Sequence, residues 1–408
     1  MDWADSGEQA AFRSEVQAFI QQRLPAFYRQ RAEVIDPAGE QDWQEDITIG
    51  SDAAQSAAKE WAGALGERGW AAPHWPEEYG GAGLSSMEQF IFNSEMAYSG
   101  APAVGGSGLR LLGPTVLVHG TEEQKKTLLP PTLRGDLMWA QGFSEPGAGS
   151  DLASLQTRAV RDGDEFVING QKMWTSSAHK ANWIFGLFRT DPDAPKHRGI
   201  SFFVMSMDTP GISVRPIISM GFKHATNETF YEDVRVPADQ MIGEENRGWY
   251  VGMTLLDYER SGIGGAIGNR QYLDRILEWV DGDAGRAQVQ HGGVALQRSA
   301  LAEHYVASEV MFNFSFRVAS MQAAGLLPNY EASTGKMFFT ELTQRIARTG
   351  TKLFGLYSNI WDGDESYAAA NAESTQMYVH SVVRTIAGGS SEIQRNIIAT
   401  RGLGLPRG

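Results

Sequence analysis

The hydrophobic pattern of this 408-residue chain changes period twice, and this change restricts the fold more than any other feature. In the N-terminal part, apolar residues recur at the spacing of one helical face, as at Phe12, Val16, Phe19 and Ile20. After Leu137 come short apolar runs such as EFVI, NWIFGLF and GISFFVM, which are typical of strands. From Gly248 to the C-terminus helical spacing returns, with breaks near 282–293, Pro328 and 362–364.

The chain is therefore predicted to be an α+β protein of three domains. We expect an N-terminal helical domain at 1–137, a middle antiparallel β domain at 138–247 and a C-terminal helical domain at 248–408. Capping boxes at Ser6 and Thr121, each with Gln three residues on, predict helix starts. The second helix is expected to stop at the proline pair 130–131, and Asp-Gly at 162–163 and Asn-Gly at 169–170 predict turns.

Composition excludes several classes of function. The chain has no cysteine, which rules out disulfides, thiolate catalysis, iron–sulfur clusters and cysteine-based zinc sites. Its net charge of −14, without a compensating Lys/Arg run, disfavours nucleic-acid binding. The longest apolar runs are far shorter than a membrane span, and the acidic start MDWADSGEQ is no export signal. The eight histidines form no metal motif, so we expect no metal. The absence of cysteine fits a reducing cytoplasm, where we expect the protein.

Two short segments together describe a cradle for a flavin. The first, FSEPGAGSD at 143–151, has Gly147 and Gly149, between which the backbone can turn sharply and approach a ligand. The second, KMWTSS at 172–177, offers Trp174 as a wall for a flat ring. Hydroxyls for the polar edge of the ring come from Ser144, Thr175 and Ser176. Taken alone, the first segment is as compatible with an ordinary turn, and the tryptophan with a core position.

Five segments, in one order over nearly the whole chain, resemble the acyl-CoA dehydrogenase family: MWAQGFSEPGAGSDLASLQT, INGQKMWTSS, FYEDVRVPADQMIG, LLDYER and GGSSEIQRNIIA. The resemblance implies that family's fold, with a C-terminal domain like a four-helix bundle. It also implies FAD-dependent α,β-desaturation of an acyl-CoA thioester, with electron-transfer flavoprotein as the acceptor. An oligomer, a dimer of dimers of one or two kinds of chain, is implied as well.

The resemblance also assigns site residues. Around the flavin it places Gln141, Phe143, Ser144, Gly149, Ser150, Trp174, Ser176, Gly355, Ser390 and Glu392. Trp174 would cover the face of the ring and Ser176 would reach its N5 atom. For the acyl-CoA it implies Ser150, Asp257 and Arg260. Arg110 is a further candidate for a second charged group on the substrate, or an ordinary helix-surface residue.

The reaction requires a carboxylate that removes the α-proton while the β-hydrogen leaves as hydride. Where much of the family has this glutamate, the chain has Gly388, in the run AGGS. In another branch the base lies on an earlier helix, directly before the Arg of a segment that here reads LDYER, which makes Glu259 the expected base. Helical spacing places Glu259 along an apolar stripe; burial there would raise its pKa and Arg260 would lower it. The alternative is an ordinary ion pair between these two residues.

Gly388 retains the backbone N–H that, in the family, donates to the thioester carbonyl. Two other segments depart from the family. Its Arg-x-x-Phe-Gly segment, which reaches a neighbouring subunit's FAD, has no match between Trp279 and Arg298, and its Gln-x-x-Gly-Gly segment reads KLFGL, which keeps Gly355. A subunit of a mixed tetramer would show such changes.

Glycines follow the expected base at Gly262, Gly264, Gly265 and Gly268. Since each costs a helix roughly 0.5 to 1 kcal/mol relative to alanine, they indicate either tight helix packing or room for a bulky, branched or cyclic acyl group. Their spacing does not fit a dinucleotide-binding fold. Two alternatives to a catalytic dehydrogenase remain at this point: a non-catalytic or co-catalytic subunit of a heteromeric dehydrogenase, and a flavin monooxygenase on the same fold.

Overall fold

The chain forms two compact units, each built from separate stretches of sequence. The computed structural model describes the backbone of residues 5–33, 42–257, 262–283, 285–286, 293–361 and 368–406. One unit combines Met1–Gln41, Leu84–Pro102 and Arg260–Gly408, and the other combines Asp42–Gly83 and Ala103–Glu259. Helices precede and follow the sheet along the chain, which confirms the predicted α+β class. The three-domain division stays a prediction.

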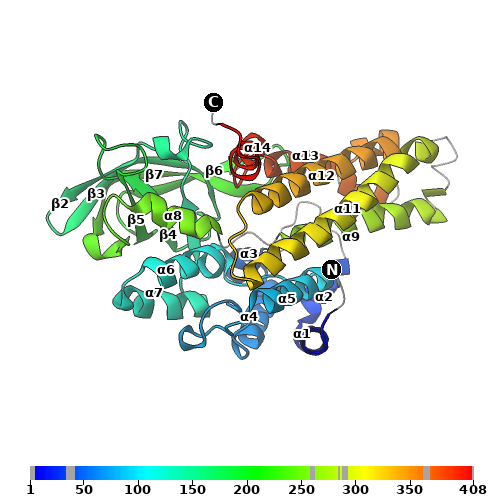
Figure 1. Ribbon diagram of the computed structural model, residues 1–408, viewed down its shortest axis with the longest axis horizontal. Helices are drawn as coiled ribbons and strands as arrows, with labels where there is room; N and C mark the ends of the chain where they lie inside the picture. Colours follow the sequence, from blue (N-terminus) through cyan, green and yellow to red (C-terminus); the bar gives the residue numbers. More distant parts are fainter. Residues whose placement is uncertain are drawn as a thin grey trace. The chain divides into compact units, whose positions relative to one another are not determined.

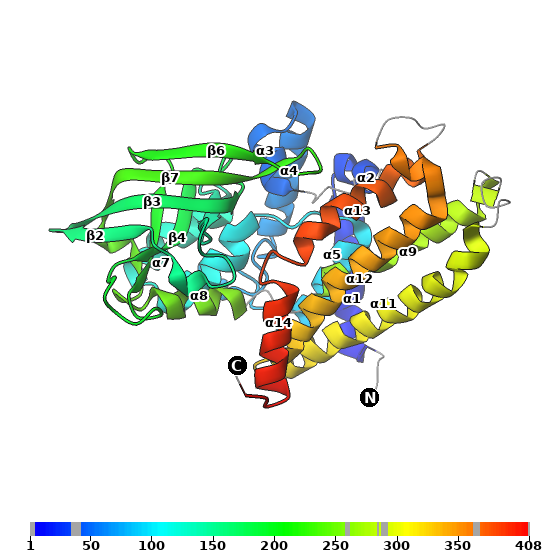
Figure 2. The ribbon, with the colours of Figure 1, turned by 90° about the horizontal axis from the view of Figure 1, so that it is seen from above.

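The first unit is helical (Figures 1 and 2). Its described helices are α1 (Gly7–Arg23), α2 (Ala26–Glu33), α5 (Ser86–Ser99), α9 (Ile263–Asp281), α11 (Gly293–Ala323), α12 (Tyr330–Phe354), α13 (Glu373–Arg384) and α14 (Ser391–Ile397). Shorter helical turns are η5 (Gly355–Asn359), η6 (Ala369–Ala372) and η7 (Ile398–Gly402). Five of these helices, α9 and α11 to α14, come from the predicted C-terminal helical region.

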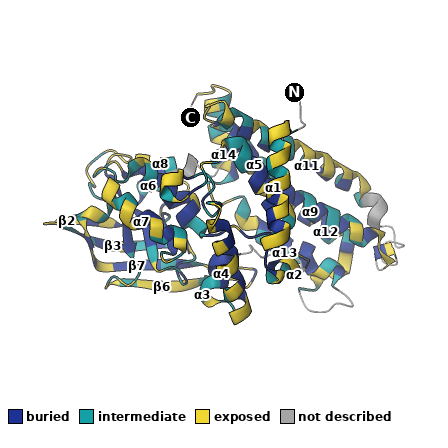
Figure 3. Cartoon of the chain, turned by 90° about the horizontal axis from the view of Figure 1, so that it is seen from below, coloured by how far each residue is buried: buried dark blue, intermediate teal, exposed yellow. Residues whose placement is uncertain are grey.

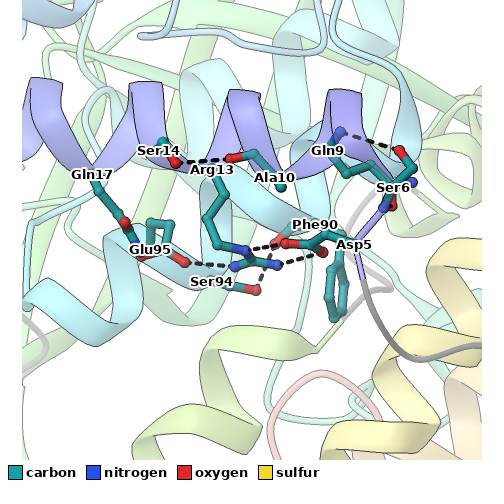
Figure 4. Close-up of polar contacts among 10 residues, drawn as sticks. All are labelled: Asp5, Ser6, Gln9, Ala10, Arg13, Ser14, Gln17, Phe90, Ser94 and Glu95. Carbon is teal, nitrogen blue, oxygen red and sulfur yellow. Dashed lines mark hydrogen bonds and ion pairs between the residues drawn. The ribbon is translucent and has the colours of Figure 1, made fainter.

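The predicted capping box starts α1, where Gln9 N donates to Ser6 Oγ at 3.2 Å and Ser6 N donates to Gln9 Oε1 at 2.9 Å. One turn on, Arg13 links α1 to α5 (Figure 4). Its guanidinium contacts Asp5 and Glu95, each at 2.6 Å. The hydrogen bond from Arg13 holds the pKa of Asp5 below its usual value.

Apolar faces of four helices make one core of the first unit. Phe90 of α5 packs edge-on against Phe312 and Phe316 of α11, with ring centroids 6.1 and 5.5 Å apart. Ile263 and Ile267 of α9 join this cluster. Buried residues recur along α12 between residues that are mostly partly buried (Figure 3), as expected for a helix that packs against several neighbours.

The second unit carries the sheet and the remaining helices. The helices are α3 (Trp43–Ile49), α4 (Asp52–Gly66), α6 (Gly113–His119), α7 (Glu122–Arg134) and α8 (Gly248–Asp257). Short helical turns are η1 (Glu77–Tyr79), η2 (Gly108–Leu112), η3 (Leu152–Ser154) and η4 (Ala238–Gln240). Among the described residues, no helix is both long and apolar enough to cross a membrane.

Helix α7 shows one wrong expectation. Its capping box at Thr121 is present, but the helix runs through Pro130 and Pro131 to Arg134. The prolines remove the hydrogen bonds to the carbonyls of Lys126 and Thr127, which lie on exposed residues where water can replace the lost donors. Burial of Leu128, Leu129 and Thr132 on the opposite side stabilises the helix across the prolines.

The eight-stranded sheet has the order β6-β7-β3-β2-β4-β5-β8, with β1 added beside β4. Its strands are β1 (Trp139–Gly142), β2 (Arg158–Asp162), β3 (Glu165–Ser176), β4 (Trp183–Arg189), β5 (Ile200–Ser206), β6 (Ile212–Ile218), β7 (His224–Pro237) and β8 (Met241–Ile242). Neighbours are antiparallel except for β4, which pairs in parallel with β1 and β2. Continuous apolar runs in β4 and β5 are buried, as predicted for core strands.

The two predicted turns had different outcomes. Asp162 pairs with Glu165 across a two-residue hairpin in which Gly163 has φ +63°, so the first turn is confirmed. The second is wrong, because β3 continues through Asn169 and Gly170. Gly170 instead marks a register shift against β7, and a Cβ at this position would lie 2.8 Å from the side chain of Thr157. A close approach of two backbones, rather than a reversal, accounts for this glycine.

Candidate functional site

The expected site residues are divided between the two units. The flavin segments at 141–150 and 174–176 belong to the second unit. Gly355, Gly388, Ser390 and Glu392 belong to the first.

The strand β1 and the residues after it place the first flavin segment. Gln141 is half-buried on β1, opposite Phe185 of β4. Phe143 is buried, and its ring meets Phe185 and Phe202 edge-on at 6.1 and 6.2 Å. Its side chain therefore belongs to the core, and what remains for a ligand at this position is backbone. Ser144 is half-buried, and its carbonyl accepts a hydrogen bond of 2.8 Å from Met173 N, which ties the two flavin segments together.

The glycine-rich loop turns tightly without left-handed glycines. Glu145 and Ala148 exchange two backbone hydrogen bonds, of 3.0 and 3.1 Å. A Cβ at Gly147 or Gly149 would meet no atom within 4 Å, so the loop has an open side that another molecule can approach. Ser150 lies exposed at its end.

Trp174 stands out in the second segment because its backbone is strained and its side chain is exposed. Its φ is +60°, a rare value for a bulky residue. The strain coincides with a bulge in β3: between Lys172 and Thr175 the register against β7 shifts, with Met173 and Trp174 of β3 opposite the single residue Glu228 of β7. The indole is 56% exposed. A bulge that turns a large aromatic ring outward, at a cost in backbone energy, is typical of a binding site.

The hydroxyls around Trp174 differ in accessibility. Thr175 is fully buried, and its Oγ1 has no hydrogen-bond partner in the part of the chain that the structure describes. The expectation that Thr175 offers its hydroxyl to a ligand is therefore not met, since the bulge turns this side chain into the core. Ser176 is exposed. Ser144 and Ser176 thus remain as the open hydroxyl groups of the two segments.

A polar cluster behind the bulge was missed in the sequence. Asn227 of β7 is fully buried and donates from Nδ2 to the carbonyl of Thr175 and pairs with His179 Nδ1, both at 3.1 Å. Its Oδ1 pairs with His224 Nε2 at 2.7 Å. The rings of the two histidines stack with centroids 3.8 Å apart. Burial, followed by the neighbouring His224, lowers the pKa of His179.

A buried ion pair, also missed, anchors the glycine-rich loop. Lys172 Nζ lies 2.7 Å from Glu145 Oε1 and 3.3 Å from the carbonyl of Phe143. Glu145 also accepts the backbone N–H groups of Gln156 and Thr157, at 2.6 and 3.0 Å. Burial lowers the pKa of Lys172 to about 8. Burial alone would raise the pKa of Glu145, but Lys172 and the hydrogen bonds keep it below its usual value.

In the first unit, Gly388 lies in the turn between α13 and α14. Gly388 and Gly389 have φ of +65° and +90°. Gly388 is exposed, and among the described residues its N–H has no acceptor. Ser390 caps α14 by accepting from Ile393 N at 3.3 Å. Glu392 is exposed, and hydrogen bonds from its own backbone and from Ser390 lower the pKa of its carboxyl group.

Several expected residues fall outside what the structure describes. Glu259 and Arg260 are not among the described residues. Asp257 ends α8, and only its backbone is described. Arg110 is exposed in η2 and contacts no partner within the described part of the chain.

The glycines that follow Glu259 serve different purposes. Gly262 has φ +64° and begins α9. A Cβ on Gly265 would lie 2.8 Å from the ring of Phe339, so this glycine allows close packing of α9 and α12. A Cβ on Gly264 or Gly268 would meet no atom of the described residues within 4 Å. Both glycines line a cleft of about 190 Å³ among α9, α12 and α13, and Met377 and Arg384 form part of its wall.

Gly355 ends α12 with φ +56° and ψ −127°, a conformation that suits only glycine. The next residue, Leu356, is 86% exposed at the position where the family segment has its second glycine.

The second unit fits a flat heteroaromatic cofactor. An exposed indole, an open hydroxyl at Ser176 and a glycine-rich loop with free space beside it are the groups that a flavin ring requires. Within the described residues, no group of three or more His, Asp or Glu side chains is arranged to hold a metal ion.

Comparisons with known families cover most of the chain. The acyl-CoA dehydrogenase N-terminal domain matches residues 6–136, the middle domain 140–234 and the C-terminal domain 246–403.

Individual relatives agree with this match. Acyl-CoA dehydrogenase FadE29 of Mycobacterium tuberculosis is 39% identical over 347 residues, which cover 84% of this chain and 87% of the relative. Among solved structures, the Tcur3481-Tcur3483 steroid ACAD is 36% identical with a TM-score of 0.81, over the full length of both chains. The ChsE4-ChsE5 complex from Mycobacterium tuberculosis is 33% identical with a TM-score of 0.82, again over both full chains. The chain therefore belongs to the acyl-CoA dehydrogenase family of oxidoreductases.

Proposed function

We propose that this chain binds FAD and introduces an α,β double bond into an acyl-CoA thioester whose acyl group is bulky, branched or cyclic. The observation that carries the proposal is the strained bulge that exposes the indole of Trp174 beside Ser176. An exposed tryptophan in a strained backbone does not stabilise a surface that is in contact with water. An aromatic cofactor, in contrast, can pack against the indole.

The cofactor residues of the proposal are those of the second unit. Trp174 packs against the flat ring, while Ser144 and Ser176 supply hydroxyl groups to its polar edge. Gly149 keeps the loop open to the cofactor, and the exposed Ser150 is assigned to the acyl-CoA. When bound, FAD supplies the two-electron acceptor for the β-hydrogen of the substrate.

Glu259 is assigned as the base that removes the proton from the α-carbon. Gly388 cannot act as a base, but its N–H is exposed and has no acceptor among the described residues. This N–H donates to the thioester carbonyl and so stabilises the negative charge that develops as Glu259 takes the proton. Asp257 and Arg260, on either side of Glu259 in the sequence, are assigned to the acyl-CoA. Gly355, Ser390 and Glu392 are assigned to the polar half of the cofactor.

A bulky acyl group is supported from two sides. Gly264 and Gly268 leave their side of α9 open to the cleft of about 190 Å³. A relative that is 36% identical over the whole chain is described as a steroid acyl-CoA dehydrogenase. The two observations together favour a ring-bearing acyl group over a straight chain.

Glu259→Gln is the test of the catalytic assignment, because it keeps the size of the side chain and removes its basicity. We expect the variant to retain FAD and to lose anaerobic bleaching of the flavin by ring-bearing acyl-CoA thioesters. Glu278→Gln, an exposed change on α9, is the control and should bleach normally. Undiminished bleaching in Glu259→Gln would refute the base. Faster turnover of octanoyl-CoA than of a ring-bearing thioester would refute the acyl group.

A second candidate is that the chain acts as the catalytic half of a heteromeric enzyme. Two related structures are described as pairs of chains, Tcur3481-Tcur3483 and ChsE4-ChsE5. Leu356 stands 86% exposed where the family has a glycine at a subunit contact. We expect FAD content to rise when the chain is purified with a second family member from the same genome. Full FAD occupancy in a homomer would exclude this assembly. Electron-transfer flavoprotein is the proposed acceptor and the cytoplasm the proposed location.

A further inference from the structure

We propose that Lys336 is a positioning residue for the backbone N–H of Gly388, and that it fixes the turn that presents this N–H to a thioester carbonyl. The proposal deepens the function above and rests on it.

The turn between α13 and α14 requires outside support. Gly388 and Gly389 both lie in the left-handed region, with φ of +65° and +90°. Two adjacent glycines can leave this conformation easily, because neither has a Cβ that restricts the backbone. No atom would lie within 4 Å of a Cβ on Gly388, so side-chain packing does not hold it. A donor that must point at a developing oxyanion works only if its direction is fixed beforehand.

Two side chains from different helices supply that support. Lys336, on α12, donates from Nζ to the carbonyl of Gly389 at 2.5 Å. Gln394, on α14, donates from Nε2 to the carbonyls of Gly388 and Gly389 at 3.3 and 3.4 Å. The bond from Lys336 is the shortest and is assisted by its charge, so it is the strongest of the three.

The backbone just before Gly388 is held as well, at the N–H of Ala387. Ala387 N donates to the carbonyl of Val383, in the last turn of α13, at 2.8 Å. The N–H of Gly388 thus belongs to a peptide between two anchored points, Ala387 on one side and the bonded carbonyls on the other. Its direction follows from these bonds rather than from packing.

Lys336 lies near two carboxylates, those of Glu341 and Glu392. It is half-buried, and burial lowers its pKa, while the carboxylates of Glu341 and Glu392 act in the opposite direction. A purely structural role is the alternative, because Lys336 connects α12 to the region of α14. The same two helices are also connected by Arg395 and Glu341, whose ion pair measures 2.7 Å. Arg395 does not touch the turn in any described contact and is therefore a matched control.

The test compares Lys336→Met with Arg395→Met in the purified full-length protein. By hydrogen–deuterium exchange, we expect the peptide that contains residues 385–391 to exchange faster in Lys336→Met and unchanged in Arg395→Met. Lys336→Arg should restore slow exchange, since arginine also donates to a carbonyl. Equal exchange in Lys336→Met and the parent protein would overturn the positioning role.

A second measurement connects the turn to the thioester. Acetoacetyl-CoA ionises to an enolate, whereas butyryl-CoA stays neutral, so only the first responds strongly to an oxyanion donor. We expect Lys336→Met to weaken acetoacetyl-CoA binding about tenfold and butyryl-CoA binding less than twofold. Equal weakening of both would show a structural role only. If the parent protein binds neither thioester while exchange still responds to Lys336→Met, the proposed function fails and the link to the thioester fails with it.

Discussion

Asn227 donates a hydrogen bond of 3.1 Å from Nδ2 to the carbonyl oxygen of Thr175, the residue that follows the strained Trp174. This contact connects β7 to β3 where the regular register between the strands is interrupted. His179 and His224 hold the amide of Asn227 from both sides. The bulge is therefore stabilised by a buried side chain in place of the regular strand hydrogen bonds.

Removal of that side chain should loosen the proposed flavin site. In Asn227→Ala, the buried carbonyl of Thr175 loses a donor, which costs about 1–2 kcal/mol. We expect FAD binding, measured by fluorescence titration, to weaken about tenfold. Asn169→Ala is the control, because Asn169 also makes side-chain bonds to β7 but lies six residues before Thr175 on β3, away from the bulge. Equal FAD affinity in both variants would show that the cluster does not position Trp174.

Breaking the Lys172–Glu145 pair should destabilise the second unit strongly. Lys172→Met leaves a buried carboxylate without its cation, and we expect a loss of about 3–5 kcal/mol in the free energy of unfolding. Addition of Glu145→Gln should recover part of the loss, because the amide oxygen still accepts a backbone N–H. In contrast, Arg235→Met breaks two exposed ion pairs, with Asp162 and Glu165, and should cost at most about 1 kcal/mol. Urea denaturation measures the free energy of unfolding of all three variants. Similar losses in Lys172→Met and Arg235→Met would contradict this prediction.

At position 174, glycine should give a more stable protein than alanine, which is the reverse of the usual order in a strand. In a strand, alanine normally gives a more stable protein than glycine. At φ +60°, however, a Cβ costs about 1 kcal/mol, and glycine avoids this cost. Without FAD, we expect Trp174→Gly to be more stable than Trp174→Ala by about 1 kcal/mol. Both should bind FAD more weakly than the parent protein. A more stable alanine variant would mean that the bulge relaxes when the indole is removed.

The sequence predicted the elements whose causes are local. The box at Ser6 and the buried runs of β4 and β5 depend on residues a few positions apart, and all are present. The errors at Pro131 and Gly170 have a common cause. In both places a packing contact from elsewhere in the chain overrides the local preference of proline or glycine.

The candidate site was predictable only in part for the same reason. Trp174 and Ser144 lie in recognisable segments, and the tie between those segments is present. Neither Asn227 nor Lys336 lies in a segment that suggested a role, since each acts on a backbone carbonyl 52 or 53 positions away. Every residue has a main-chain carbonyl oxygen, so the residue type of the acceptor does not show that such a hydrogen bond is made. Lys172 is different, because a lysine two residues before Trp174 inside an apolar strand could have been recognised as buried.

Alanine substitutions in α9 should show which glycines pack closely against a neighbour and which face open space. Gly264→Ala and Gly268→Ala add a methyl group with no neighbour within 4 Å and should stabilise the fold by about 0.4–1 kcal/mol each. Gly265→Ala should destabilise it, because the methyl group would lie 2.8 Å from the ring of Phe339. Thermal unfolding distinguishes them. If the cleft receives the acyl group, the two stabilised variants should also raise KM for ring-bearing thioesters, and unchanged KM values would separate the cleft from the substrate.

Acid should destabilise the second unit through His74. Burial lowers the pKa of His74 to about 4, and among the described residues its Nε2 has no hydrogen-bond partner. The unfolded chain takes up this proton near pH 6.5 and the folded chain only near pH 4, so stability falls as the pH drops through this window. The contribution is at most about 3 kcal/mol. In His74→Gln, denaturation between pH 7 and 4.5 should show a shallower loss of stability, whereas the exposed His197→Gln should follow the parent protein. Identical pH profiles for His74→Gln and the parent would mean that the folded protein accepts the proton at His74 without penalty.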